Sequence, residues 1–145
     1  MEDRYLFKAK FDNSDRWVTG QLVEVNNTYF IIPNHATKIL AGWFSTSNII
    51  EVKKDTICQC TGLKDKNGKL IWENDVVRVT INGGSTICRC AFADTVAQFQ
   101  LWQEHTIKRT STVLNLGNYE CEVVDNIFDN PDMTIRSCRR CKNDD

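Results

Sequence analysis

The sequence predicts a mainly β fold with little helix. Short apolar runs alternate with polar residues at a period of two, which is typical of strands that bury one face. Asn, Gly, Pro and Asp residues separate these runs at the spacing expected of a small barrel or sandwich. No stretch has the sustained periodicity of a long amphipathic helix. With 145 residues and 41% apolar content, the chain can form one domain or two small ones that share a core.

The N-terminal part, residues 1–55, reads as an antiparallel meander that packs on the rest of the fold. Residues 5–11 alternate, with Tyr5, Phe7, Ala9 and Phe11 on one face, and predict a first strand. The runs 16–25 and 28–32 predict two more, joined by an Asn-Asn pair that tolerates left-handed backbone. Gly20 inside the second run indicates a bulge or a close approach of another backbone.

The second part, residues 56–133, contains the least ambiguous local structure. Asn67-Gly68 predicts a tight turn, because both residue types accept positive φ at little cost. Residues 76–93 predict a hairpin around Asn-Gly-Gly, and residues 119–127 predict a further strand. The remaining segment, 134–145, is a basic tail with two cysteines and few apolar residues, and we expect it to be mobile.

Two separated stretches resemble the signature of the YopX family. Residues 56–79 read TICQCTGLKDKNGKLIWENDVVRV. They are similar to the family's Gln-aromatic-Thr-Gly-Leu-x-Asp-x-Asn-Gly-Lys run and the aromatic-Glu-Gly-Asp-Ile/Val step after it. Residues 121–131 read CEVVDNIFDNP and resemble the family's closing pattern, Val-Ile-Gly-Asn-Ile-aromatic-x-Asn-Pro. Segments 7–10, 16–20 and 31–33 also fit, so the resemblance extends over nearly the whole chain.

The sequence departs from the family pattern at a few positions. Cys60 stands where an aromatic residue is usual, and Cys58 where Gly is common. Asn74 stands where the family prefers Gly before Asp75, and Asn holds the same left-handed turn at modest cost. Asp125 replaces another Gly. The two cysteine departures indicate local variation and not a family-wide set of ligands.

The resemblance implies a mostly β fold that contains an SH3-like barrel, which we assign to residues 56–133. It also implies a phage or prophage accessory protein without an established activity or cofactor. We expect a non-catalytic binding module for a host or phage protein. The alternatives are a small barrel that binds single-stranded nucleic acid and, in third place, a small hydrolase.

The expected compartment is the cytoplasm of the bacterial host. No apolar run approaches the roughly 20 residues that cross a bilayer, and the start of the chain lacks a secretory signal. The formal net charge is −1, and neither half of the chain is basic enough to bind phosphate backbones non-specifically. The lack of a long apolar run argues against a membrane partner, and the near-neutral charge argues against a generic nucleic-acid ligand. A protein partner is therefore favoured.

The turn in the family motif supplies the first set of candidate binding residues. They are Thr61, Gly62, Asp65, Asn67, Gly68 and Asp75. Asp65 and Asp75, with Glu73, could act as an acid–base pair or hold a cation. In the structural alternative, Asp65 caps its own turn and Asp75 accepts backbone N–H bonds at the entrance of a strand.

Aromatic residues supply the second set of candidates. Trp43 and Phe44 lie in a segment without a clear pattern, and we expect them to form an exposed contact. They could also be hidden between subunits, so a homo-oligomer is a further expectation. Trp17 and Trp72 could offer stacking faces for bases, but their place on predicted strands favours core packing.

Seven cysteines are many for this length. Six of them form close pairs: Cys58 and Cys60, Cys88 and Cys90, Cys138 and Cys141. Two such pairs could hold zinc. On a strand, however, alternate residues face the same side, so Cys88, Cys90 and Phe92 are expected to line the core. Only the last pair has the spacing of a zinc knuckle. We therefore predict free thiols and no metal.

Overall fold

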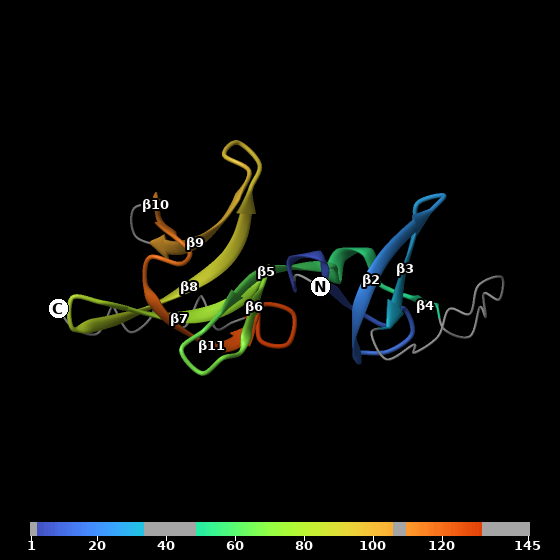
Figure 1. Cartoon of the computed structure of the whole chain (residues 1–145), viewed down its shortest axis with the longest axis horizontal. Helices are drawn as coiled ribbons and strands as arrows, with labels where there is room; N and C mark the ends of the chain where they lie inside the picture. Colours follow the sequence, from blue (N-terminus) through green and yellow to red (C-terminus); the bar gives the residue numbers. More distant parts are fainter. Residues whose placement is uncertain (1–2, 34–48, 106–109, 132–145) are drawn as a thin grey trace. The chain divides into compact units, whose positions relative to one another are not determined.

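The computed structural model describes residues 3–33, 49–105 and 110–131, which form two compact units, Met1–Cys60 and Thr61–Asp145 (Figure 1). All strand pairs described in them are antiparallel. Helix is limited there to two 3-10 segments, η1 (Asp3–Tyr5) and η3 (Lys54–Thr56). The predicted mainly β fold with little helix is therefore confirmed. Neither helical segment of the described residues has the length or apolar character needed to cross a membrane.

The first unit is a curled meander. Its strands are β1 (Phe7–Lys10), β2 (Trp17–Val25), β3 (Thr28–Pro33), β4 (Ile50–Glu51) and the beginning of β5 (Cys58–Lys64). They lie in the order β4-β3-β2-β1-β5. A bridge between Phe11 and Val52 joins the end of β1 to the residue after β4. This bridge draws the two ends of the meander together.

Two local predictions in the first unit are confirmed. Asn26 and Asn27 have φ of 50° and 63° and turn the chain from β2 into β3. At Gly20, a Cβ would overlap the carbonyl oxygen of Ile32 on β3, which is the close backbone approach expected from a glycine within a strand. The core of this unit is small and lies between the strands. It consists of Ala9, Val18, Ile31 and Val52.

The second unit is built on a five-stranded sheet in the order β10-β9-β8-β7-β11. Its strands are β7 (Asp75–Ile81), β8 (Gly84–Ala93), β9 (Gln98–His105), β10 (Thr110–Asn115) and β11 (Glu120–Asn126). The short β6 (Leu70–Trp72) pairs with β5. Asn82 and Gly83, with φ of 48° and 81°, form the predicted turn between β7 and β8.

The five-stranded sheet is open in the described residues. Its edge strands, β10 and β11, do not pair with each other there. The closed SH3-like barrel that we assigned to residues 56–133 is therefore not confirmed. The division into 1–55 and 56–133 stays a prediction, and the tail 134–145 lies outside the described residues.

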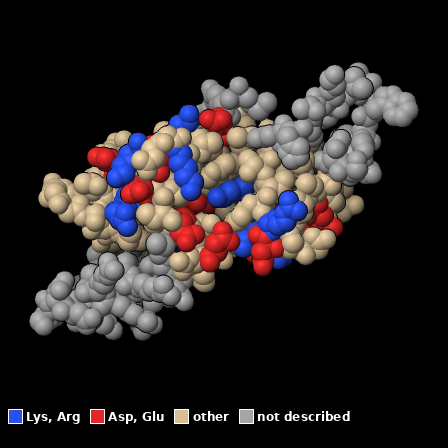
Figure 2. Space-filling model, turned by 90° about the horizontal axis from the view of Figure 1, so that it is seen from below, with Lys and Arg blue, Asp and Glu red and all other residues tan. Residues whose placement is uncertain are grey.

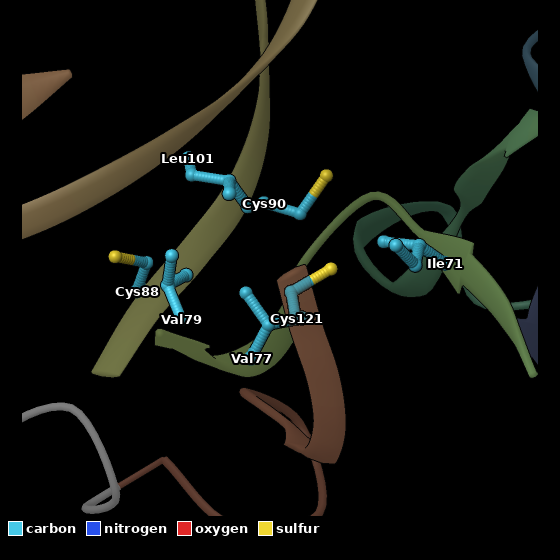
Figure 3. Close-up of a cluster of buried hydrophobic side chains, with 7 residues drawn as sticks. All are labelled: Ile71, Val77, Val79, Cys88, Cys90, Leu101 and Cys121. Carbon is cyan, nitrogen blue, oxygen red and sulfur yellow. The ribbon is translucent and has the colours of Figure 1, made fainter. Parts of the chain in front are cut away.

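The core of the second unit is a cluster of apolar side chains and thiols (Figure 3). Its members are Ile71, Val77, Val79, Cys88, Cys90, Leu101 and Cys121. The predicted core position of Cys88 and Cys90 is confirmed, since both are fully buried. The same prediction is wrong for Phe92, which is 40% exposed. The alternation of β8 continues to Phe92, but β8 ends at Ala93, and at this end of the hairpin it is the cross-strand partner Phe99 that packs against the cluster.

Candidate functional site

The family-motif turn is closed by backbone hydrogen bonds and by one carboxylate. The Asp65 N–H donates to the Lys69 carbonyl (2.8 Å), and the Gly68 N–H donates to the Asp65 carbonyl (3.0 Å). The Asp65 Oδ1 accepts from the N–H groups of Asn67 and Lys69, both at 2.9 Å. Gly68 has φ of 79°, a conformation that glycine adopts without strain. The structural prediction, that Asp65 caps its own turn, is confirmed.

The same carboxylate reaches a strand far along the chain. Its other oxygen, Oδ2, accepts from the N–H of Val123 on β11 at 2.9 Å. Beside it, the Lys66 N–H donates to the carbonyl of Cys121 at 2.9 Å. The turn therefore occupies two backbone groups of β11 that its ladder with β7 leaves free. Unpaired groups on an edge strand invite pairing with other chains, so Asp65 also protects this edge.

The electrostatic state of Asp65 follows from this geometry. Burial by itself would raise the pKa of the carboxyl group. The backbone N–H groups of Val123, Lys69 and Asn67, with the charge of Lys69, outweigh burial and hold the pKa below its ordinary value of 3.8. Asp65 is therefore a carboxylate at neutral pH, with both oxygens engaged in hydrogen bonds to the backbone.

The second acidic residue of the motif stabilises the corner between β6 and β7. Asp75 is 2% exposed, and its Oδ2 accepts from the Trp72 N–H at 2.9 Å. The predicted role of Asp75 at the strand entrance is thus confirmed. Asn74 adopts φ of 68° and donates its N–H to the Cys90 carbonyl, while its own carbonyl accepts from Ile127. Hydrogen bonds therefore tie this corner to Cys90 within β8 and to Ile127, the residue after β11.

The two remaining residues of the set shape β5. The Thr61 hydroxyl donates to the Ile71 carbonyl on β6 (2.7 Å) and accepts from the Leu63 N–H (3.1 Å). Gly62 lies between them with φ of 80°. The candidate residues therefore lie on a turn and on adjacent strands, and the described contacts of Thr61, Asp65 and Asp75 hold these elements together. A binding role for the set stays a prediction.

Comparison with protein families agrees with this arrangement. The family model described as "YopX protein" matches residues 6–134. The chain belongs to the YopX family. The match contains both motif segments, 56–79 and 121–131, and the Asp65–Val123 hydrogen bond joins one to the other. A search of curated proteins finds no match.

Two thiols of the core cluster, Cys88 and Cys121, have a raised pKa. Burial, and secondarily Cys121, raises the pKa of Cys88 to about 11. Burial, with the negative charges of Asp65 and Glu120, also raises the pKa of Cys121. Zinc and electrophiles require the thiolate. Within the described residues no group of three or more His, Cys, Asp or Glu side chains is placed to hold a metal ion.

The remaining candidate residues from the sequence analysis are not part of the YopX turn. Trp43 and Phe44 lie outside the described residues, as do Cys138 and Cys141. Trp72 is 9% exposed, as predicted for core packing. Trp17 is only half-buried, and the prediction of core packing is wrong for it. Its ring instead faces two lysines of β1.

Cations approach aromatic rings at several positions of the first unit. The Nζ atoms of Lys8 and Lys10 lie 4.9 and 5.4 Å from the centroid of Trp17. Similar contacts join Arg16 to Phe11 and Lys54 to Tyr29. One acidic residue lies near these cations: the exposed Asp15 is 4.0 Å from Lys10 and 3.6 Å from the neighbouring Lys53. On the face shown in Figure 2, basic and acidic side chains are interspersed.

Sequence reasoning missed the end of the β8–β9 hairpin, residues 92–99. The rings of Phe92 and Phe99 meet edge to face, with centroids 5.1 Å apart. Phe92 is 40% exposed and Val96 is 55% exposed. The available signal was an aromatic residue on each side of a polar turn. The alternation of apolar and polar residues does not show at which residue a strand stops being buried by the core.

Proposed function

We propose that this YopX-family protein is a non-catalytic module that binds another protein, and that it serves as a phage or prophage accessory factor. The observation that carries the proposal is the hairpin end, residues 92–99. It presents Phe92, paired with Phe99, and Val96 to solvent on a projecting hairpin. Aromatic residues that combine a large contact area with few rotatable bonds are enriched at protein interfaces.

The use of the YopX-motif carboxylates supports a non-catalytic role. A general acid or base must present its carboxyl group to a substrate. Asp65 instead accepts three backbone N–H bonds, and Asp75 is buried against Trp72. We therefore assign these two groups to the scaffold and the contact function to the hairpin end.

A capture experiment tests this assignment. Immobilised protein is exposed to bacterial host lysate, and the variant Val96→Lys is compared with Val25→Lys. Val25 is the matched control, because it is 53% exposed at the tip of a different hairpin. We expect a specific partner that Val96→Lys loses and Val25→Lys keeps. No specific partner, or equal capture by both variants, contradicts the proposal.

A second candidate function is binding of single-stranded nucleic acid. The combination of Lys8 and Lys10 with the half-buried ring of Trp17 favours it, because such proteins join cationic grooves to stacking aromatics. A gel-shift series with single-stranded DNA and RNA over a range of salt tests this function. Binding that weakens as salt rises supports it, and absence of binding at low ionic strength excludes it.

A further inference from the structure

The dipeptide Asn-Gly occurs twice in the sequence, each time in a turn. Asn67-Gly68 belongs to the YopX turn, and Asn82-Gly83 joins β7 to β8. The dipeptide is chemically labile, because the backbone nitrogen that follows an asparagine can attack the carbon of its side-chain amide. Glycine in the second position favours the attack, since it has no Cβ and its backbone rotates easily. Whether a given copy reacts depends on how its turn is held.

The turn of Asn82-Gly83 leaves the reacting groups accessible. Both residues are exposed, as are Gly84 and Ser85 after them. Within the described residues, the Gly83 N–H donates no hydrogen bond and the Asn82 side chain has no partner. The nearest paired residues are Ile81 and Gly84, at the end of the β7–β8 ladder. Exposed ends with few contacts open locally at low free-energy cost, so the Gly83 nitrogen can approach the Asn82 side chain.

The turn of Asn67-Gly68 holds the same groups in place. The Gly68 N–H, which supplies the attacking nitrogen, donates to the Asp65 carbonyl at 3.0 Å. The Asp65 carboxylate accepts from the N–H groups of Asn67 and Lys69, both at 2.9 Å, on either side of Gly68. Attack on the Asn67 side chain requires the peptide group between Asn67 and Gly68 to rotate, which breaks the Gly68 bond and displaces Lys69. These hydrogen bonds therefore oppose the reaction.

We propose that Asn82 is a site of spontaneous deamidation and that the Asp65 cap protects Asn67 from the same reaction. The Gly83 nitrogen forms a bond to the Cγ of Asn82, and the bond from Cγ to Nδ2 breaks. Nδ2 leaves as ammonia and takes the proton that the Gly83 nitrogen loses. Water then opens the succinimide ring at one of its two carbonyl groups, so that position 82 becomes aspartate or isoaspartate.

Both products alter the tip of the β7–β8 hairpin. Each product adds a negative charge there. Isoaspartate also inserts a methylene group into the main chain, so the two-residue turn between Ile81 and Gly84 becomes longer than the paired strands require. The inference goes beyond the proposed protein-binding function and does not depend on it, because Asn82 precedes β8 whereas Phe92 and Val96 lie at the other end of that strand.

Peptide mapping by mass spectrometry follows both sites while the folded protein is incubated in mildly alkaline buffer. The exchange of an amide NH₂ for OH raises the mass of the peptide, and an isoaspartate-specific carboxyl methyltransferase labels the isoaspartate. We expect Asn82 to react at least about tenfold faster than Asn67, because opening the YopX turn breaks at least one hydrogen bond to a charged group. Asn82→Gln should remove the product at position 82, since glutamine forms the corresponding larger ring much more slowly.

Two further measurements separate the effect of structure from that of local sequence. In denaturing urea the two sites should react at similar rates. In folded Asp65→Ala the rate at Asn67 should rise, while the rate at Asn82 stays unchanged. The proposal is overturned by equal rates at the two sites of the folded wild type or by absence of product at Asn82. It is also overturned if the tenfold difference persists in urea, or if Asp65→Ala leaves Asn67 unchanged or accelerates both sites equally.

Discussion

The YopX turn, residues 65–69, and the hairpin end, residues 92–99, use their side chains in opposite ways. In the turn, Asp65 gives both carboxylate oxygens to backbone N–H groups, one of them 58 residues away. At the hairpin end, Phe92 and Val96 remain exposed beyond the core. The family motif therefore holds the fold together through Asp65, whereas the hairpin end leaves apolar side chains exposed.

The largest expected difference between core and hairpin end is in side-chain packing. Leu101→Ala removes a fully buried side chain from the cluster and should lower the free energy of unfolding by about 2–5 kcal/mol. Phe92→Ala removes a half-exposed ring and should cost about 1 kcal/mol or less. Urea denaturation measures both values. Equal losses would show that the hairpin end is part of the core.

The turn should be nearly as sensitive as the core. Asp65→Ala removes three hydrogen bonds and leaves the Val123 N–H without its acceptor, so we expect a loss of about 2–3 kcal/mol by urea denaturation. Asn67→Ala is the matched control, because Asn67 donates to Asp65 through its backbone N–H and its side chain is exposed. A loss below about 0.5 kcal/mol in Asp65→Ala contradicts the scaffold role.

The turn should also make stability depend on pH. The folded-state pKa of Asp65 lies below its ordinary value of 3.8, so the unfolded chain takes up the proton first as pH falls. The contribution of Asp65 is complete above that ordinary value and is lost as pH falls through the lowered pKa. Urea denaturation of the wild type and of Asp65→Asn at several acidic pH values measures how the free energy of unfolding depends on pH in each protein. We expect a shallower acid slope in the variant, and parallel slopes would exclude the effect.

The smallest expected effect concerns the corner before β7. Asn74 has φ of 68°, so Asn74→Gly removes a modest strain and should raise stability by up to about 1 kcal/mol. Asn67→Gly, in the same motif, should bring no such gain, because Asn67 is not among the residues with positive φ. A thermal melt of each variant compares them. The account of this corner fails if both variants gain equally or if Asn74→Gly loses stability.

The structural features predicted from the sequence are those formed by residues that lie close together along the chain. The Asn82-Gly83 hairpin and the cap of Asp65 on its own turn depend on contacts within a few residues, and both were predicted. By contrast, Thr56 ends the 3-10 segment η3 and accepts the Lys10 N–H through its hydroxyl. That contact joins residues 46 positions apart, which no local pattern reveals.

The candidate site shows the same limit. The cap of Asp65 on its own turn was predicted, but its hydrogen bond to Val123 has no local signal. Alternation along β8 placed Phe92 in the core because periodicity reports which face a residue takes and not how far the cover extends. The partner of Asp65 and the exposure of Phe92 both depend on the tertiary structure, which local patterns do not report.

Amide hydrogen exchange at Val123 tests the central claim most directly, because its N–H is the donor that joins the two YopX segments. The account predicts that this amide is protected in the wild type. In Asp65→Ala it should exchange much faster, while the amides of the β7–β8 ladder keep their protection. Unchanged exchange at Val123 in Asp65→Ala would contradict the claim that this carboxylate ties the turn to β11.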